Sequence, residues 1–236
     1  MPQPGQEIYF VTIIARVRIC MKPRRIIYQL RRNVRDHGWR VTLPRAIKLL
    51  FRHWYETREY RIYRIDLRRY HQPPPLSGSR WTFRFLTKAD TAAIKQIEQM
   101  EDSLAGWMHT RLSNGSICLA AFDGEQVAGF NLISFGQIRV PTIHWTHTFR
   151  SDCGWGEQIT IAPHYRRRRI ALELRHRILT ELKCRGITRL YGGAFAFNHP
   201  SLNLARKAGF TEIATMLYRK RFNSSELRCC RMKPPT

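Results

Sequence analysis

The amino-acid sequence predicts a mixed α/β fold for the C-terminal two-thirds of the chain, with a central sheet flanked by helices. Two apolar runs at 116–122 and 126–135 are separated by Asp123 and Gly124, a strong hairpin signal. Strand-like and helix-like segments alternate after them, an order typical of strand-helix-strand units. Three successive prolines at 73–75 separate this region from a basic N-terminal third.

Periodicity and end signals define the individual elements. Apolar residues recur every three or four positions on the segment 170–183, and Gly186 closes it, so we expect an amphipathic helix there. Thr87, with Asp90 three residues later, marks another helix start. The full expected order after the prolines is strand 81–86, helix from 87, helix 104–112, hairpin strands 116–122 and 126–135, loop and strand residues 136–154, strand 155–162, helix 170–183, strand 187–197, helix 200–207, and strand or hairpin 211–222.

The predicted domain organisation has four parts: a basic N-terminal extension (1–71), a proline-rich linker (72–80), the α/β domain (81–222) and a tail (223–236). Within the extension, helical spacing predicts two amphipathic helices, at 24–37 and 42–54. Partial alternation around 60–65 predicts a strand at a sheet edge.

Charge is concentrated at the N-terminal end. The chain carries a net charge of +24, and residues 1–80 hold 18 Lys and Arg against 5 acids. Such a surplus favours an anionic partner, namely nucleic acid, an acidic lipid surface or a phosphorylated molecule. A solvated basic surface that keeps the protein soluble is the alternative. Nucleic-acid binding rests on charge alone, because no base-reading motif is present.

The six cysteines show no C-x-x-C pair, so we predict no metal site and a reduced, cytoplasmic location. The apolar run at 8–17 is too short to span a bilayer, and Glu7 precedes it where an export signal would carry positive charge.

The segment 161–171 carries the clearest chemical signal. It joins a strand end to a helix start through four successive arginines, 166–169. Backbone N–H groups and the positive end of the helix converge at such a turn, which suits phosphate. Arginines add bidentate donors. A basic, solvated turn is the alternative interpretation.

Two motifs in this region resemble those of the GNAT N-acetyltransferase superfamily. Pro163, Tyr165, Arg166 and the small Ala171 have the relative positions of its coenzyme A loop. About 35 residues on, Asn198-His199-Pro200-Ser201 leading to Lys207, Gly209 and Phe210 resembles the second motif of the superfamily. The resemblance covers residues 81–222 and implies an enzyme that uses acetyl-coenzyme A (acetyl-CoA).

The resemblance also implies site residues. The backbone of Ile159, Thr160 and Ile161 would pair with the pantetheine arm. The pyrophosphate would lie on Arg166, Arg167, Arg168, Arg169, Ile170 and Ala171. Asn198 would contact the arm and Ser201 would line the same channel, although Asn198 could be a plain helix N-cap.

Catalysis requires a base, and Glu157 occupies a strand position where some superfamily members keep a catalytic Glu. His144 and His147 are alternatives, and a surface role for Glu157 is a third. Two departures stand out. Arg169 replaces the usual glycine of the loop, which could narrow the phosphate site, and Ala205 replaces a proton-donating Tyr. Water or Tyr218 could supply that proton instead.

The expected function is transfer of an acetyl or other acyl group from CoA to an amine of an unidentified, anionic acceptor. One alternative is a CoA-binding module that has lost efficient catalysis. Another is an acyltransferase that acts on lipid-linked material at a membrane surface, through the basic face of the segment 42–54.

Overall fold

The structure is a computed structural model that describes residues 55–73, 80–101, 104–221 and 224–231. The two helices expected before residue 55, and most of the expected linker, lie outside these residues. The chain divides into two compact units, one of residues 1–60 with 215–231 and one of residues 61–214 with 232–236. Each unit is described by itself.

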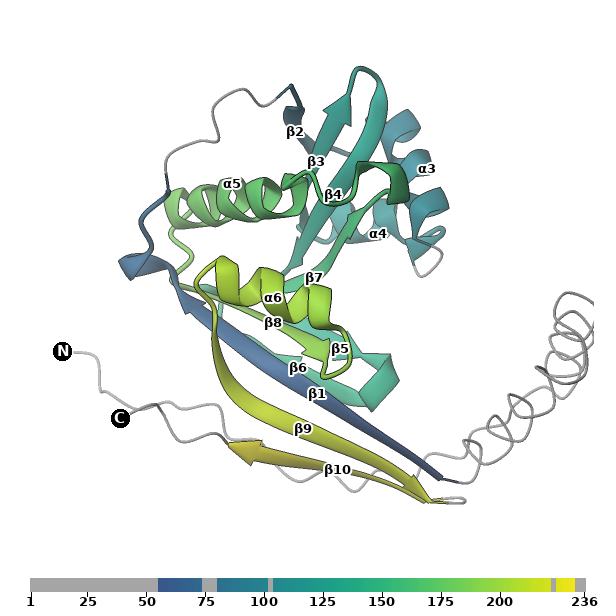
Figure 1. The fold of residues 1–236 in the computed structure, drawn as a ribbon, viewed down its shortest axis with the longest axis vertical. Helices are drawn as coiled ribbons and strands as arrows, with labels where there is room; N and C mark the ends of the chain where they lie inside the picture. Colours follow the sequence, from purple (N-terminus) through teal and green to yellow (C-terminus); the bar gives the residue numbers. More distant parts are fainter. Residues whose placement is uncertain (1–54, 74–79, 102–103, 222–223, 232–236) are drawn as a thin grey trace, which may run out of the picture. The chain divides into compact units, whose positions relative to one another are not determined.

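The larger unit contains a mixed sheet with helices on both faces (Figure 1). Its strand order is β9-β1-β8-β7-β4-β3-β2, and β1 and β9 also contribute residues to the smaller unit. The strands are β1 (Tyr55–Asp66), β2 (Thr82–Leu86), β3 (Ile117–Asp123), β4 (Gln126–Ser134), β7 (Cys153–Ile161), β8 (Arg189–Phe195) and β9 (Thr211–Arg221). The helices are α3 (Thr91–Met100), α4 (Met108–Ser113), α5 (Ile170–Cys184) and α6 (His199–Lys207).

The two faces of the sheet bury separate cores. Alternate residues of β3 illustrate this division, because Leu119 packs into a cluster with α5 whereas Cys118 packs into a cluster with α3 and α4. Strands β3 and β4 are buried almost throughout, as expected for strands covered on both faces. The pairs β2–β3, β3–β4 and β4–β7 are antiparallel, and β7–β8 is parallel.

The mixed α/β fold with its central sheet is confirmed, and several local predictions need correction. The strand around 60–65 is not at an edge, because β1 lies between β9 and β8. Ile62, Tyr63 and Ile65 are all buried there, which a partly alternating pattern did not indicate. The backbone amide and the hydroxyl of Thr87 donate to Asp90, but α3 begins only at Thr91.

The region 136–154 forms a separate two-stranded sheet, β5 (Gln137–Val140) with β6 (Trp145–Thr148), rather than a loop followed by a strand. His144, whose backbone has the left-handed conformation with φ of 50°, lies between the two strands.

The smaller unit contains the first residues of β1, the last residues of β9, and β10 (Ser224–Arg231), which lies in the segment expected to be a tail. Arg58 forms an ion pair with Glu56 at 2.8 Å, and its guanidinium lies 6.0 Å from the ring centroid of Tyr218. Arg228 carries another ion pair, with Glu226.

Candidate functional site

Strands β7 and β8 pair only over their first residues. Their parallel register runs from Cys153 with Arg189 to Gly156 with Gly192, whereas β7 stays paired with β4 as far as Ile161. Figure 1 shows the two strands diverging toward their C-terminal ends. In the described part of the chain, the β8-facing edge of β7 is therefore unpaired over residues 157–161.

The backbone of this open edge can bind an extended ligand. The amide of Ala162 donates to the carbonyl oxygen of Ala128 on β4 at 3.0 Å. Because successive residues of a strand direct their backbone groups to opposite sides, Thr160 also faces β4, and Ile159 and Ile161 face the open side. The hydrogen bond from Arg166 Nε to the carbonyl oxygen of Ile161, at 3.2 Å, fits this alternation.

Two of the three predicted backbone positions, Ile159 and Ile161, thus have the open orientation. The backbone of the third, Thr160, faces β4. Its side-chain hydroxyl contacts two polar groups, Glu101 Oε2 at 3.3 Å and Gln158 Nε2 at 3.0 Å.

The turn between β7 and α5 contains a row of backbone amides without hydrogen-bond partners. Arg167 and Arg169 both have φ of 63°, the left-handed region, and α5 starts immediately afterwards. Within the described residues, the amides of 167–171 have no hydrogen-bond acceptor, and the first paired amide is that of Leu172, which donates to Arg169 at 3.0 Å. Successive free N–H groups of this kind, at the positive end of a helix, form an anion site.

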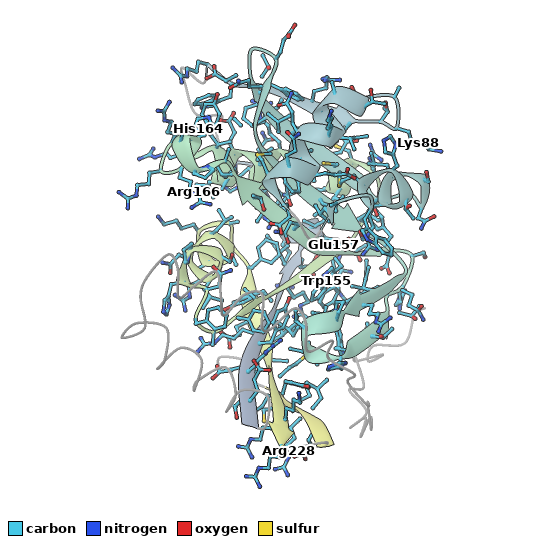
Figure 2. All side chains as sticks on the ribbon, turned by 90° about the vertical axis from the view of Figure 1, so that its right-hand side faces the viewer. Lys88, Trp155, Glu157, His164, Arg166 and Arg228 are labelled. Carbon is cyan, nitrogen blue, oxygen red and sulfur yellow. The ribbon has the colours of Figure 1, made fainter. Side chains whose placement is uncertain are left out.

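The arginine side chains of this turn, 166–169, are all exposed. Figure 2 shows Arg166 and His164 at the periphery, away from Glu157. Tyr165 is buried and packs edge-to-face on Trp81, with the Arg168 guanidinium 5.9 Å from its ring. Arg169 adopts the left-handed conformation for which glycine is suited, and its side chain is exposed. Replacement of the glycine therefore adds backbone strain at this position.

Glu157 is the extra residue of a β-bulge in β7. Leu132 of β4 pairs with Gln158 and Ile133 pairs with Gly156, so Glu157 has no opposite residue. Bulges next to active sites commonly redirect a side chain. Glu157 directly follows Gly156, the last residue paired with β8, and so lies where the two strands begin to separate.

Both carboxylate oxygens of Glu157 have protein partners. Oε1 accepts from Arg111 Nη2 of α4, and Oε2 accepts from the hydroxyl of Ser134 on β4. The Ser134 hydroxyl lies 2.9 Å from that of Ser116. Arg111 and Ser134 therefore fix the orientation of the carboxylate. The sequence pattern does not indicate either partner, because their contact with Glu157 depends on strand register and on the position of α4.

The alternative base His147 lies on β6 in an aromatic cluster. Its ring stacks on Trp145 at 5.5 Å and packs on Phe149 at 4.6 Å, and both of these residues contact Trp155 of β7. Burial lowers the pKa of His147 below its ordinary value. These contacts indicate a packing role for this histidine.

The second motif begins α6. Asn198 is the N-cap, and its side-chain oxygen accepts from the amide of Ser201 at 3.3 Å. In this structure Asn198 therefore acts as an N-cap, which was the alternative interpretation. A contact between Asn198 and pantetheine stays a prediction. Ala205 packs against the core and offers no proton. Tyr218, considered as a substitute acid, belongs to the smaller unit.

Among the residues that the structure describes, no three His, Cys, Asp or Glu side chains gather as a metal site would require. No helix in the same ranges is long and apolar enough to cross a membrane. The predicted membrane-surface helix at 42–54, and most of the basic extension proposed to bind an anionic partner, fall before residue 55.

The structure thus contains the strand, the arginine turn and the following helix that the two sequence motifs predicted. The sequence model of the acetyltransferase (GNAT) family matches residues 80–210, and the chain belongs to this family. No curated protein matches the sequence.

Solved structures show the same fold at low sequence identity. A GCN5-related N-acetyltransferase from Sphaerobacter thermophilus is 17% identical, with a TM-score of 0.52 over 81% of this chain and 58% of that chain. A tandem GNAT protein of the clavulanic acid pathway is 13% identical, with a TM-score of 0.52 over 77% and 55%. A glucosamine N-acetyltransferase region of a fungal multi-domain β-N-acetylglucosaminidase is 14% identical, with a TM-score of 0.55 over 78% and 23%. The chain thus spans less than two-thirds of these proteins.

Proposed function

We propose that the protein is an N-acetyltransferase that transfers an acetyl or related acyl group from its CoA thioester to an amine. The observation that carries the proposal is the open edge of β7, which leads directly into the free amides of residues 167–171. A ligand with an extended amide-containing arm and a pyrophosphate at one end fits both features.

Individual residues would hold the coenzyme in distinct ways. Ile159 and Ile161 would exchange backbone hydrogen bonds with the pantetheine arm, in the manner of an added strand. The amides of residues 167–171 would bind the pyrophosphate, and the exposed arginines 166–169 would add charge-assisted hydrogen bonds. Ser201 and Asn198 would flank the arm from the start of α6. The thioester itself supplies an activated acyl group.

Glu157 is proposed as the base that accepts the amine proton, directly or through a water molecule. A carboxylate has about four lone-pair sites. Arg111 and Ser134 occupy one on each oxygen, so acceptor sites remain. The leaving thiol needs no strong acid, because thiol pKa values lie near 8.5. Water can therefore supply the proton that Ala205 cannot.

Thermal melting with and without coenzyme tests the binding half of the proposal. A ligand at about 100 times its dissociation constant stabilises a fold by about 2.7 kcal/mol. For a domain of about 150 residues this corresponds to a rise of about 5–11 °C. Acetyl-CoA should produce such a rise and dephosphorylated pantetheine a much smaller one. Arg168→Ala should reduce the rise more than Arg80→Ala, and absence of any rise at millimolar coenzyme would refute the proposal.

A binding module without efficient catalysis is the second candidate, and Ala205 favours it. Product masses after incubation with acetyl-CoA and pooled amines separate the two functions. If Glu157 is the base, Glu157→Gln should lower turnover sharply and leave coenzyme affinity nearly unchanged. Glu181→Gln, which removes a half-buried, paired carboxylate of α5, is the matched control and should leave turnover unchanged. A melting shift with no product from any amine would favour the binding module.

The identity of the acceptor, its anionic character and the cytoplasmic location stay predictions. Their basis is the charge of the N-terminal third and the cysteine content of the sequence.

A further inference from the structure

Arg175 is a charged residue on the buried stripe of α5. Its neighbours at helical spacing on that stripe, Ile178, Leu179 and Leu182, are fully buried. The Nε of Arg175 is inaccessible to solvent and has no hydrogen-bond partner. Among the described residues no acid forms an ion pair with it, whereas Arg177 on the same helix pairs with Glu173 at 2.9 Å. The contact that the guanidinium does make is with the ring of Phe210, 5.5 Å away.

The end of this side chain lies where β7 and β8 separate. A Cβ atom placed on Gly156 would be 3.1 Å from Arg175 Nη1 and 3.5 Å from the carbonyl oxygen of Tyr191. Gly156 is the last residue of β7 that pairs with β8, and Glu157 follows it. The guanidinium therefore lies on the α5 face of the sheet, at the point where the pairing of β7 with β8 ends, whereas the carboxylate of Glu157 contacts α4.

A cation in this position lacks its natural partner. Burial lowers the pKa of Arg175 to about 10, which still leaves the group charged at neutral pH. Arg175 as a whole is half-buried, but its Nε is an unpaired buried donor, and such a donor usually has a functional explanation. The planar guanidinium fork is matched by a carboxylate, which can accept two parallel hydrogen bonds.

We propose that Arg175 binds a carboxylate of a bound substrate at the closed end of the gap between β7 and β8, and so sets substrate specificity. The inference rests on the proposed function. The carboxylate has two available sources, the acyl group of a dicarboxylic acyl-CoA or an amino-acid acceptor. Either source would bring a negative charge to the end of β7–β8 pairing, where Arg175 lies.

Two pairs of ligands distinguish the sources on the full chain. The first pair is succinyl-CoA against acetyl-CoA, and the second is pooled amino acids against the corresponding amino amides, with and without CoA. The wild type should bind the carboxylate-bearing member of one pair more tightly, by about tenfold or more, as measured from melting shifts. Arg175→Met should abolish that preference and Arg175→Lys should retain part of it. Arg177→Met, on the exposed face of α5, should leave it intact.

The outcomes separate this inference from the proposed function. Arg175→Met should fold at least as well as the wild type, because a flexible unbranched side chain replaces one whose buried Nε has no partner. Coenzyme binding without a carboxylate preference in either pair would overturn the role of Arg175 and leave the proposed function standing. Absence of coenzyme binding would refute the proposed function. The amino-acid pair, measured without CoA, would in that case still show whether Arg175 binds a carboxylate. An equal preference in wild type and Arg175→Met would also refute the inference.

Discussion

Gly129 of β4 is the position where the open edge of β7 is most sensitive to a single methyl group. A Cβ atom at this residue would lie 2.4 Å from Ile161 Cδ1 and 2.8 Å from the carbonyl oxygen of Thr160. The Ile161 side chain can rotate away, but the carbonyl belongs to the backbone of β7. Gly129→Ala must therefore push β7 outward at the residues proposed to pair with pantetheine.

The magnitude follows from the geometry. Overpacking of a well-packed site costs about 1–3 kcal/mol. At about 2–4 °C per kcal/mol for a domain of this size, the melting temperature should fall by about 2–12 °C. Ile161→Ala combined with Gly129→Ala should recover little of this loss, because the contact with the Thr160 carbonyl remains. Acetyl-CoA should also raise the melting temperature of Gly129→Ala less than that of the wild type.

Gly192→Ala is the matched control, since it is a glycine of the adjoining strand whose added Cβ would meet only the carbonyl oxygen of Gly156, at 3.8 Å. Melting within about 2 °C of the wild type is expected for this variant. The reasoning is refuted if Gly129→Ala melts like the wild type, or if both variants lose the same stability.

The remaining predictions concern strain, capping and pH. Arg169→Gly should stabilise the fold by up to about 1 kcal/mol in urea unfolding, because a left-handed L-residue costs about 1–2 kcal/mol and glycine entropy offsets only part of this; a loss of stability would contradict the strain. Asn198→Ala should cost about 0.5–2 kcal/mol through loss of the N-cap, and a neutral result would remove that role. Burial lowers the pKa values of His147 and His176, so the unfolded chain binds more protons, and stability present above pH 6.5 should be lost as the pH falls further. Unfolding curves that do not change between about pH 7 and 5 would disprove this dependence.

The sequence by itself determined the type and order of most elements in the α/β domain. Helix α5 and strands β3 and β4 follow from periodicity, turn residues and apolar runs that act over a few residues. The arginine turn at 166–169 was also visible, because a proline, an aromatic residue and four arginines at a strand-helix junction form a local pattern. The N-cap alternative for Asn198 is another local feature, and the structure contains it.

Tertiary structure decided everything that depends on distant segments. The interior position of β1 follows from its neighbours β8 and β9, which lie more than a hundred residues further along the chain. The bulge that redirects Glu157 depends on the register between β4 and β7, and its partner Arg111 comes from a third element. The unpaired charge of Arg175 is visible only once α5 packs on the sheet, because a helical pattern shows which residue types recur and not whether an arginine has an acid beside it.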